Sequence, residues 1–101
     1  METGCVEMVS YKLKPDVTAE SFMESVRTLQ RIVENEAGFR DRQVFHDKVT
    51  DTWVEVVRWA SREAAERCGR EIMGRPEMQE GFAMIEPSTI ELRYMNEVNA
   101  G

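Results

Sequence analysis

The stretch from Thr52 to Ala65 constrains the fold of this chain more than any other. Its sequence, TWVEVVRWASREAA, predicts a strand from Trp53 to Trp59 that runs almost directly into a helix N-capped by Ser61. The strand has bulky apolar side chains on both of its faces, so both faces need cover. The remaining elements must therefore be arranged so that other side chains pack on both faces of this strand.

The first third of the chain predicts a central strand followed by a long amphipathic helix. Residues 5–13 are largely apolar on both faces, which favours a position inside a sheet rather than at its edge. Thr18 is expected to cap the helix. Its apolar positions recur at steps of three and four residues, at Phe22, Val26, Leu29 and Val33. Gly38 is expected to end the helix as a left-handed C′ residue.

The rest of the chain predicts a hairpin, two further helices and a last strand. Residues 39–46 form the second strand, and a turn at 47–51 joins it to the Trp53–Trp59 strand in a register that the sequence leaves open. The helix at 61–73 has a buried stripe of small side chains. Pro76 starts a further short helix, Pro87 closes it, and residues 88–98 form the last strand.

This order of elements is that of a ferredoxin-like α+β fold, the split βαβ arrangement, with helices on one face of a four-stranded antiparallel sheet. A length of 101 residues supports a single domain, residues 1–101. The uncovered sheet face carries either the set Trp53, Val57 and Trp59 or the set Val54 and Val56, and both are too apolar for water. We therefore expect a homodimer in which two sheets face each other as an α/β barrel.

Composition narrows the classes of function. The net charge of −6, with 13 basic and 19 acidic residues, argues against nucleic acid as a partner. No apolar run is long enough to cross a membrane, and the start of the chain lacks the features of a signal peptide, so a cytoplasmic location is the default expectation. One histidine and two distant cysteines, Cys5 and Cys68, give no metal-ligand cluster and no CxxC pair. Both cysteines are expected to be buried thiols.

Two short motifs resemble a known family. They are Gly38-Phe39 at the end of the first helix and the run from Trp59 to Ala65 after the hairpin, WASREAA. The pattern is similar to that of the antibiotic biosynthesis monooxygenase domains of the dimeric α/β barrel superfamily, across about residues 6–98. These positions are mostly structural, because the glycine stops a helix, Ser61 caps the next helix and an alanine packs it. The resemblance is therefore specific for the fold and weaker for the chemistry.

The resemblance implies several possible activities. Some members oxidise polycyclic phenols to quinones without metal or flavin, because the substrate carbanion itself reduces O₂, while others cleave heme, isomerise or cyclise. The heme-degrading members use an Asn on the first strand, a Trp at the end of the third and a His on the second helix. Only the Trp is matched here, by Trp59. The resemblance thus implies a cofactor-independent monooxygenase acting on a small apolar aromatic or polyketide-like substrate.

Several side chains are candidates for such a site. His46 is the only histidine and the only side chain that ordinarily titrates near neutrality, so it is the candidate general base, although a lone His at a strand end is also typical of the surface. Trp59 would border a substrate or fill the core, and Trp53, near the hairpin turn, would bind the substrate or close one end of the barrel. Tyr11 and Tyr94 would hydrogen-bond a substrate carbonyl or pack.

Arg58 and Glu55 lie on opposite faces of one strand. Whichever of them points inward needs a partner in a dry interior, and it would mark the site, with Arg58 the candidate substrate-binding residue. The alternative function is a non-catalytic dimeric domain that binds a small apolar ligand or only assembles. A cavity reached by His46 and the inward charged residue would favour the oxygenase, and an interior filled by side chains would favour the alternative.

Overall fold

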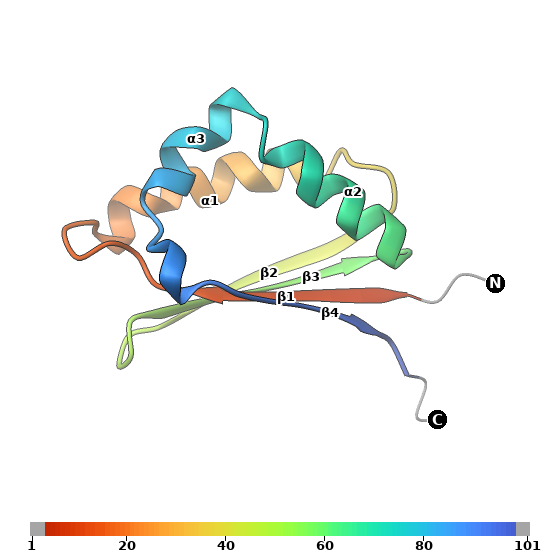
Figure 1. Cartoon of the computed structure of the whole chain (residues 1–101), viewed down its shortest axis with the longest axis horizontal. Coiled ribbons are helices and arrows are strands. Elements are labelled where there is room, and N and C mark those ends of the chain that lie inside the picture. Colours follow the sequence, from red (N-terminus) through yellow and green to blue (C-terminus); the bar gives the residue numbers. More distant parts are fainter. Residues whose placement is uncertain (1–3, 99–101) are drawn as a thin grey trace.

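The computed structural model describes residues 4–98, which form an antiparallel sheet with helices on one face only (Figure 1). The elements in chain order are β1 (Cys5–Tyr11), α1 (Ala19–Val33), β2 (Phe39–Asp47), β3 (Thr52–Trp59), α2 (Arg62–Ile72), α3 (Pro76–Ala83), the 3₁₀ turn η1 (Pro87–Thr89) and β4 (Glu91–Asn96). This arrangement confirms the predicted ferredoxin-like α+β fold. No helix of the described range is long and apolar enough to cross a membrane.

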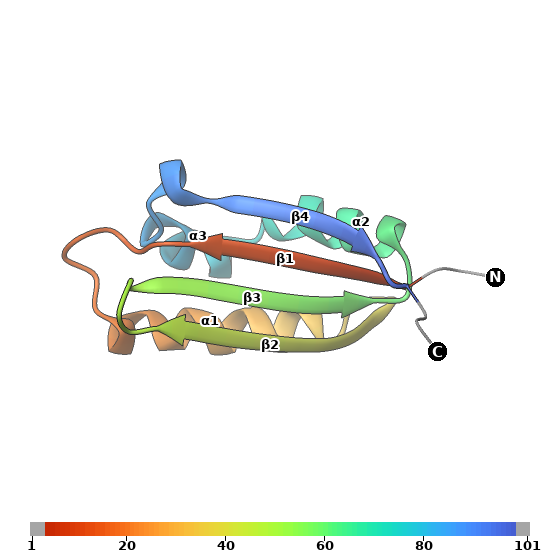
Figure 2. The same ribbon diagram turned by 90° about the horizontal axis from the view of Figure 1, so that it is seen from below.

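The sheet order is β2-β3-β1-β4, and every neighbouring pair is antiparallel (Figure 2). β1 lies opposite β3 in a register that pairs Cys5 with Trp59 and Tyr11 with Trp53. The hairpin register, open from the sequence, pairs His46 with Trp53. The set that faces the helices therefore includes Trp53, Val57 and Trp59, since cross-strand partners share a face.

The open face of the sheet carries the other set. Val54 and Val56 of β3 point away from the helices, together with Val6 and Met8 of β1, which pair with Arg58 and Val56. Figure 2 looks onto this face, and no helix of the described chain covers it. Of the two sets that the sequence offered, the uncovered one is Val54 and Val56.

The helix starts follow the predicted capping chemistry. Thr18 Oγ1 accepts a hydrogen bond from the Ser21 amide at 3.1 Å, and Ser61 Oγ accepts one from the Ala64 amide at 3.2 Å. These side chains satisfy backbone donors that a first turn leaves free. Pro76 is the first residue of α3, as predicted.

Two predicted helix ends were wrong. α1 stops at Val33, several residues before Gly38, and two successive turns connect them. Gly38 does adopt a left-handed backbone, with φ of 86°, but it lies in the turn directly before β2 rather than at the end of α1. Pro87 does not close α3, which ends at Ala83; instead Pro87 opens η1, and this turn delays the start of β4 to Glu91. In both places, between α1 and β2 and between α3 and β4, the helix ends early and backbone turns make the connection, so the predicted glycine or proline does not end the helix.

The buried side chains form two clusters at opposite ends of the sheet. The cluster beneath α2 comprises Cys5, Val33, Val57, Trp59, Ala64, Ala65 and Cys68. The cluster beside α1 comprises Tyr11, Leu13, Phe22, Val26 and Trp53. Both thiols are buried and free, as predicted, and burial raises the pKa of Cys68 to about 12, which keeps it protonated at neutral pH.

Candidate functional site

A cavity of about 770 Å³ lies between the sheet and the helices. This volume is within the range of small-molecule sites, roughly 300–1,000 Å³. Every strand and α-helix of the described chain contributes to its lining, which is mostly apolar and includes Val9, Leu29, Val57, Ile72, Met78 and Phe82. Met73, Ile90 and Leu92 also line it but are 65%, 47% and 49% exposed, so they mark its mouth.

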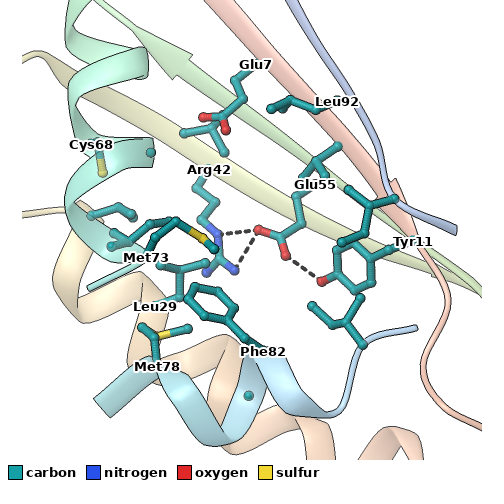
Figure 3. A pocket seen from close by; sticks show the side chains of 18 of the residues that line it. Glu7, Tyr11, Leu29, Arg42, Glu55, Cys68, Met73, Met78, Phe82 and Leu92 are labelled. Carbon is teal, nitrogen blue, oxygen red and sulfur yellow. Dashed lines mark hydrogen bonds and ion pairs between the residues drawn. The ribbon is translucent and has the colours of Figure 1, made fainter. Parts of the chain in front are cut away.

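Glu55 forms the polar centre of the cavity together with Arg42 and Tyr11 (Figure 3). Alternation along β3 points Glu55 toward the helices, where it is only 6% exposed. Its Oε1 accepts hydrogen bonds from Arg42 Nε at 3.0 Å and Nη2 at 2.8 Å, and its Oε2 accepts one from the Tyr11 hydroxyl at 2.5 Å. The inward charged residue is thus Glu55, and it is fully paired, as a buried carboxylate must be.

Arg42 ties this centre to α1. Its Nη1 donates to the Val26 carbonyl at 2.9 Å and to Gln30 Oε1 at 3.3 Å, and its side chain is 1% exposed. One guanidinium therefore links β2, β3 and the nearest helix. Burial, followed by the neighbouring charge of Glu55, raises the pKa of Tyr11 above its usual value, so this hydroxyl stays protonated and serves as a donor.

A second polar group lies toward the α2 end of the cavity. Glu7 of β1 is opposite Val57 on one side and Tyr94 on the other, and Trp59 Nε1 donates to Glu7 Oε1 at 3.0 Å. Burial raises the pKa of Glu7, the hydrogen bond from Trp59 opposes that rise, and the charge of Glu55 adds to it. Arg62 stacks its guanidinium 5.4 Å from the centre of the Tyr94 ring.

Three of the sequence-predicted site residues line the cavity, namely Tyr11, Trp59 and Tyr94. Tyr11 belongs to the polar centre, whereas Trp59 and Tyr94 accompany Glu7. The two tyrosines are on neighbouring strands, as expected, but in different parts of the cavity. The structure brings these three residues together around one space.

The other three candidates lie elsewhere. His46 stacks on Trp53 with 4.4 Å between ring centres, and its Nε2 lies 2.7 Å from Asp51 Oδ1 in the hairpin turn. Trp53 is 3% exposed within the α1-side cluster, and its Nε1 has no hydrogen-bond partner among residues 4–98. Arg58 is on the open face, where its Nη1 lies 3.6 Å from Glu97. None of the three lines the cavity.

Glu7 and Arg42 were missed by the sequence reasoning. The signal for Glu7 was available, because it shares the alternation of Cys5, Val9 and Tyr11 and is the one charged residue among them. Arg42 gave no comparable signal, since β2 has an irregularity between Phe39 and Asp41 that breaks its alternation. No group of three or more His, Cys, Asp or Glu side chains within residues 4–98 could hold a metal ion.

Comparisons with known proteins agree with this architecture. Residues 5–83 match the family model described as Antibiotic biosynthesis monooxygenase. A variant of SnoaB, a cofactor-independent oxygenase from Streptomyces nogalater, superposes with a TM-score of 0.79 at 11% identity, covering 97% of this chain and 96% of that one. PA3566 from Pseudomonas aeruginosa superposes with a TM-score of 0.74 at 15% identity, covering 98% of each chain.

A conserved protein from Methanosarcina mazei Go1 is also similar, with a TM-score of 0.74 at 14% identity over 95% of this chain and 94% of that one. No curated protein matches the sequence. At these identities the solved structures show a common fold alone, and the chemistry has to be argued from the residues of the cavity.

Proposed function

The chain belongs to the antibiotic biosynthesis monooxygenase family, and from this premise we propose that it is a cofactor-independent monooxygenase acting on a small, apolar hydroxyaromatic or polyketide-like compound. The observation that carries the proposal is the mostly apolar cavity of about 770 Å³ around a fixed Arg42–Glu55–Tyr11 centre. An apolar pocket with a few convergent polar groups is typical of a small-molecule site. An interior filled by side chains would instead have favoured a domain that only assembles.

The polar centre suits a substrate that becomes an anion. A guanidinium has five N–H donors. Arg42 uses its Nε and Nη2 toward Glu55, and two bonds from Nη1 go to Val26 and Gln30, which leaves one Nη2 hydrogen without a partner among residues 4–98. A fixed cationic donor of this kind would stabilise an oxyanion on the substrate ring, while the apolar walls would hold the rings and exclude water.

The reaction balances without an added reductant. A base removes a proton from the activated ring carbon, and the resulting carbanion gives one electron to O₂. The radical pair then combines to a peroxide anion, which takes the proton back from the base, and the O–O bond of the resulting hydroperoxide breaks with loss of water to leave a carbonyl. For an anthrone, one molecule of anthrone and one of O₂ give one anthraquinone and one water. The substrate supplies all the electrons, so the protein has only to bind, deprotonate and orient it.

Oxygen consumption with an anthrone tests this proposal. Protein treated with EDTA, with no flavin or heme added, is expected to consume one O₂ per quinone formed, measured with an oxygen electrode and by the quinone absorbance. Leu92→Trp at the mouth of the cavity should lower kcat/KM about tenfold or more, because it narrows the opening. Glu24→Trp, on the exposed side of α1 and outside the cavity lining, is the matched control and should leave it unchanged.

A rate no faster than the spontaneous oxidation of the anthrone would contradict the oxygenase. Binding can be read separately from quenching of the tryptophan fluorescence, because Trp59, one of the two tryptophans, lines the cavity. Quenching without turnover would favour the binding-domain alternative.

We also propose that the protein is a homodimer through the open sheet face. The face presents Val6, Met8, Val54 and Val56 around its centre, and Phe45 on β2 is 51% exposed there. Such a contiguous apolar surface is rarely left in water. Homologues in this family are typically dimeric.

Sedimentation equilibrium at micromolar concentration is therefore expected to give about twice the chain mass of 11.7 kDa. Val56→Glu should dissociate the dimer, because two-fold symmetry would bury one carboxylate from each subunit in an apolar interface. Val49→Glu, in the hairpin turn at 94% exposure, is the control and should remain dimeric. A monomeric parent would contradict this part of the proposal.

A further inference from the structure

We propose that Glu7 is the general base of this cavity, taking the substrate proton on its free carboxylate oxygen while Trp59 holds the other oxygen in place. The inference rests on the proposed oxygenase function and assigns its proton-transfer step to a residue. Three carboxylates line the cavity, those of Glu7, Glu55 and Glu66. The inference is based on which of their oxygens already accept hydrogen bonds from the protein.

Glu55 and Glu66 are already engaged. Glu55 accepts bonds on both oxygens, from Arg42 and from Tyr11, and breaking any of them would leave a buried charge short of partners. Glu66 accepts from Arg62 Nε at 2.8 Å, and its side chain is 41% exposed, which places its charge in solvent. A base in an apolar cavity needs a carboxylate oxygen that accepts no hydrogen bond from the protein and is shielded from solvent. Neither Glu55 nor Glu66 has such an oxygen.

Glu7 has that oxygen. Within residues 4–98 its one side-chain hydrogen bond is from Trp59 Nε1 to Oε1, and its Oε2 has no partner. Figure 3 shows the side chain pointing into the same cavity as Glu55 and Arg42. Proton transfer needs a base positioned within hydrogen-bond reach of the substrate, and Glu7 is on the sheet face that the substrate would cover.

Trp59 is suited to a positioning role. Its side chain is 1% exposed, so the indole ring is fixed by packing. The indole N–H can donate but cannot accept, so it orients the carboxylate without competing for the proton. The edge-to-face contact between Trp59 and Phe39, with 5.7 Å between ring centres, further restricts the ring.

The surroundings of Glu7 set its proton affinity. Burial raises the pKa, and Glu55 on β3 adds to the rise, while the Trp59 hydrogen bond and Arg42 on β2 lower it. The charge of Glu7 also acts on Tyr94 of β4, Cys5 of β1 and Cys68 of α2, and α2 adds Glu66 and Arg70 to the lining of the same cavity. A carboxylate with a raised pKa is a stronger base, and a rate that depends on it rises as pH rises through that pKa.

Glu7→Gln is the decisive variant, because the amide keeps the shape and can still accept from Trp59 but cannot take a proton. We expect kcat with the anthrone to fall about 10²–10⁴-fold with a smaller change in KM, and the rise of kcat with pH to disappear. Glu7→Asp should recover part of the rate with a shifted pH profile. Glu63→Gln, on the exposed side of α2, is the matched control and should keep the parental rate and profile.

A second measurement needs no substrate. Because the folded state raises the pKa of Glu7, its ionisation costs stability, and that cost appears as pH rises through the folded-state value. Glu7→Gln should therefore have a higher Tm than the parent at about pH 8 and the same Tm at about pH 4, where the carboxyl is largely protonated. Equal melting curves at both pH values would contradict a sheltered, titrating Glu7.

The outcomes separate the two claims. Parental kcat and pH profile in Glu7→Gln overturn the inference and leave the oxygenase standing. Loss of activity in His46→Ala together with a parental rate in Glu7→Gln assigns the proton to the hairpin histidine instead, and also overturns it. A parent that does not oxidise the anthrone at all overturns the proposed function, and the role of Glu7 falls with it.

Discussion

Replacing Arg42 with methionine is expected to lower the free energy of unfolding by about 3–5 kcal/mol, because it removes one partner of a buried ion pair. Glu55 would remain only 6% exposed with its cation gone, and the Val26 carbonyl would lose its donor. Both penalties arise from the folded state alone, since water satisfies these groups in the unfolded chain. Urea unfolding at pH 7, followed by far-UV circular dichroism, measures the loss.

Two variants establish the cause. The double variant Arg42→Met with Glu55→Leu should recover part of the loss, because it removes the unpaired buried charge, although the Val26 carbonyl and the Tyr11 hydroxyl stay without their partners. Arg62→Met breaks the exposed Arg62–Glu66 pair at 2.8 Å together with the Arg62–Tyr94 stack, and should cost less than about 2 kcal/mol. If Arg42→Met unfolds at the same urea concentration as Arg62→Met, the Arg42–Glu55 pair is not the buried contact described above.

Local signals made most of the fold predictable. The caps at Thr18 and Ser61 and the period of the first helix depend on residues within one turn of each other, so they can be read along the chain. The hairpin register could not be read this way, because it depends on the turn. Asp51 adopts a positive φ of 55° there, a conformation that a non-glycine residue rarely uses.

The site was harder to predict than the fold. Alternation along β3 showed that Glu55 and Arg58 occupy opposite faces of the strand. It could not show which face the helices cover, because that depends on the tertiary packing of the whole chain. Arg42 could not be placed by counting, because the irregularity between Phe39 and Asp41 reverses the alternation of β2. His46 was the candidate base because it is the only histidine in the sequence. Its imidazole contacts Asp51 in the hairpin turn, so it does not line the cavity, and the residue type alone could not show this.

Gly38→Ala is expected to cost about 2–5 kcal/mol of unfolding free energy. Part of the cost is the left-handed backbone, where φ is 86° and a side chain costs about 1–2 kcal/mol. The rest is overpacking, because a Cβ at this position would lie 2.7 Å from the Cβ of Ala64. The backbone at Gly38 cannot easily move away, since its carbonyl accepts a 2.7 Å hydrogen bond from the amide of Ala60, the residue after β3.

Two companions separate these terms in the same urea experiment. Gly38→Ala with Ala64→Gly removes the steric contact and should leave the backbone cost of about 1–2 kcal/mol, together with a smaller penalty for glycine within α2. Gly74→Ala is the control, because a Cβ there would meet only the Glu71 carbonyl at 3.8 Å, and its stability should stay within about 1 kcal/mol of the parent. If Gly38→Ala is as stable as Gly74→Ala, Gly38 in the turn before β2 does not lie tightly against Ala64 of α2, and the close packing of this helix on the sheet depends on other contacts.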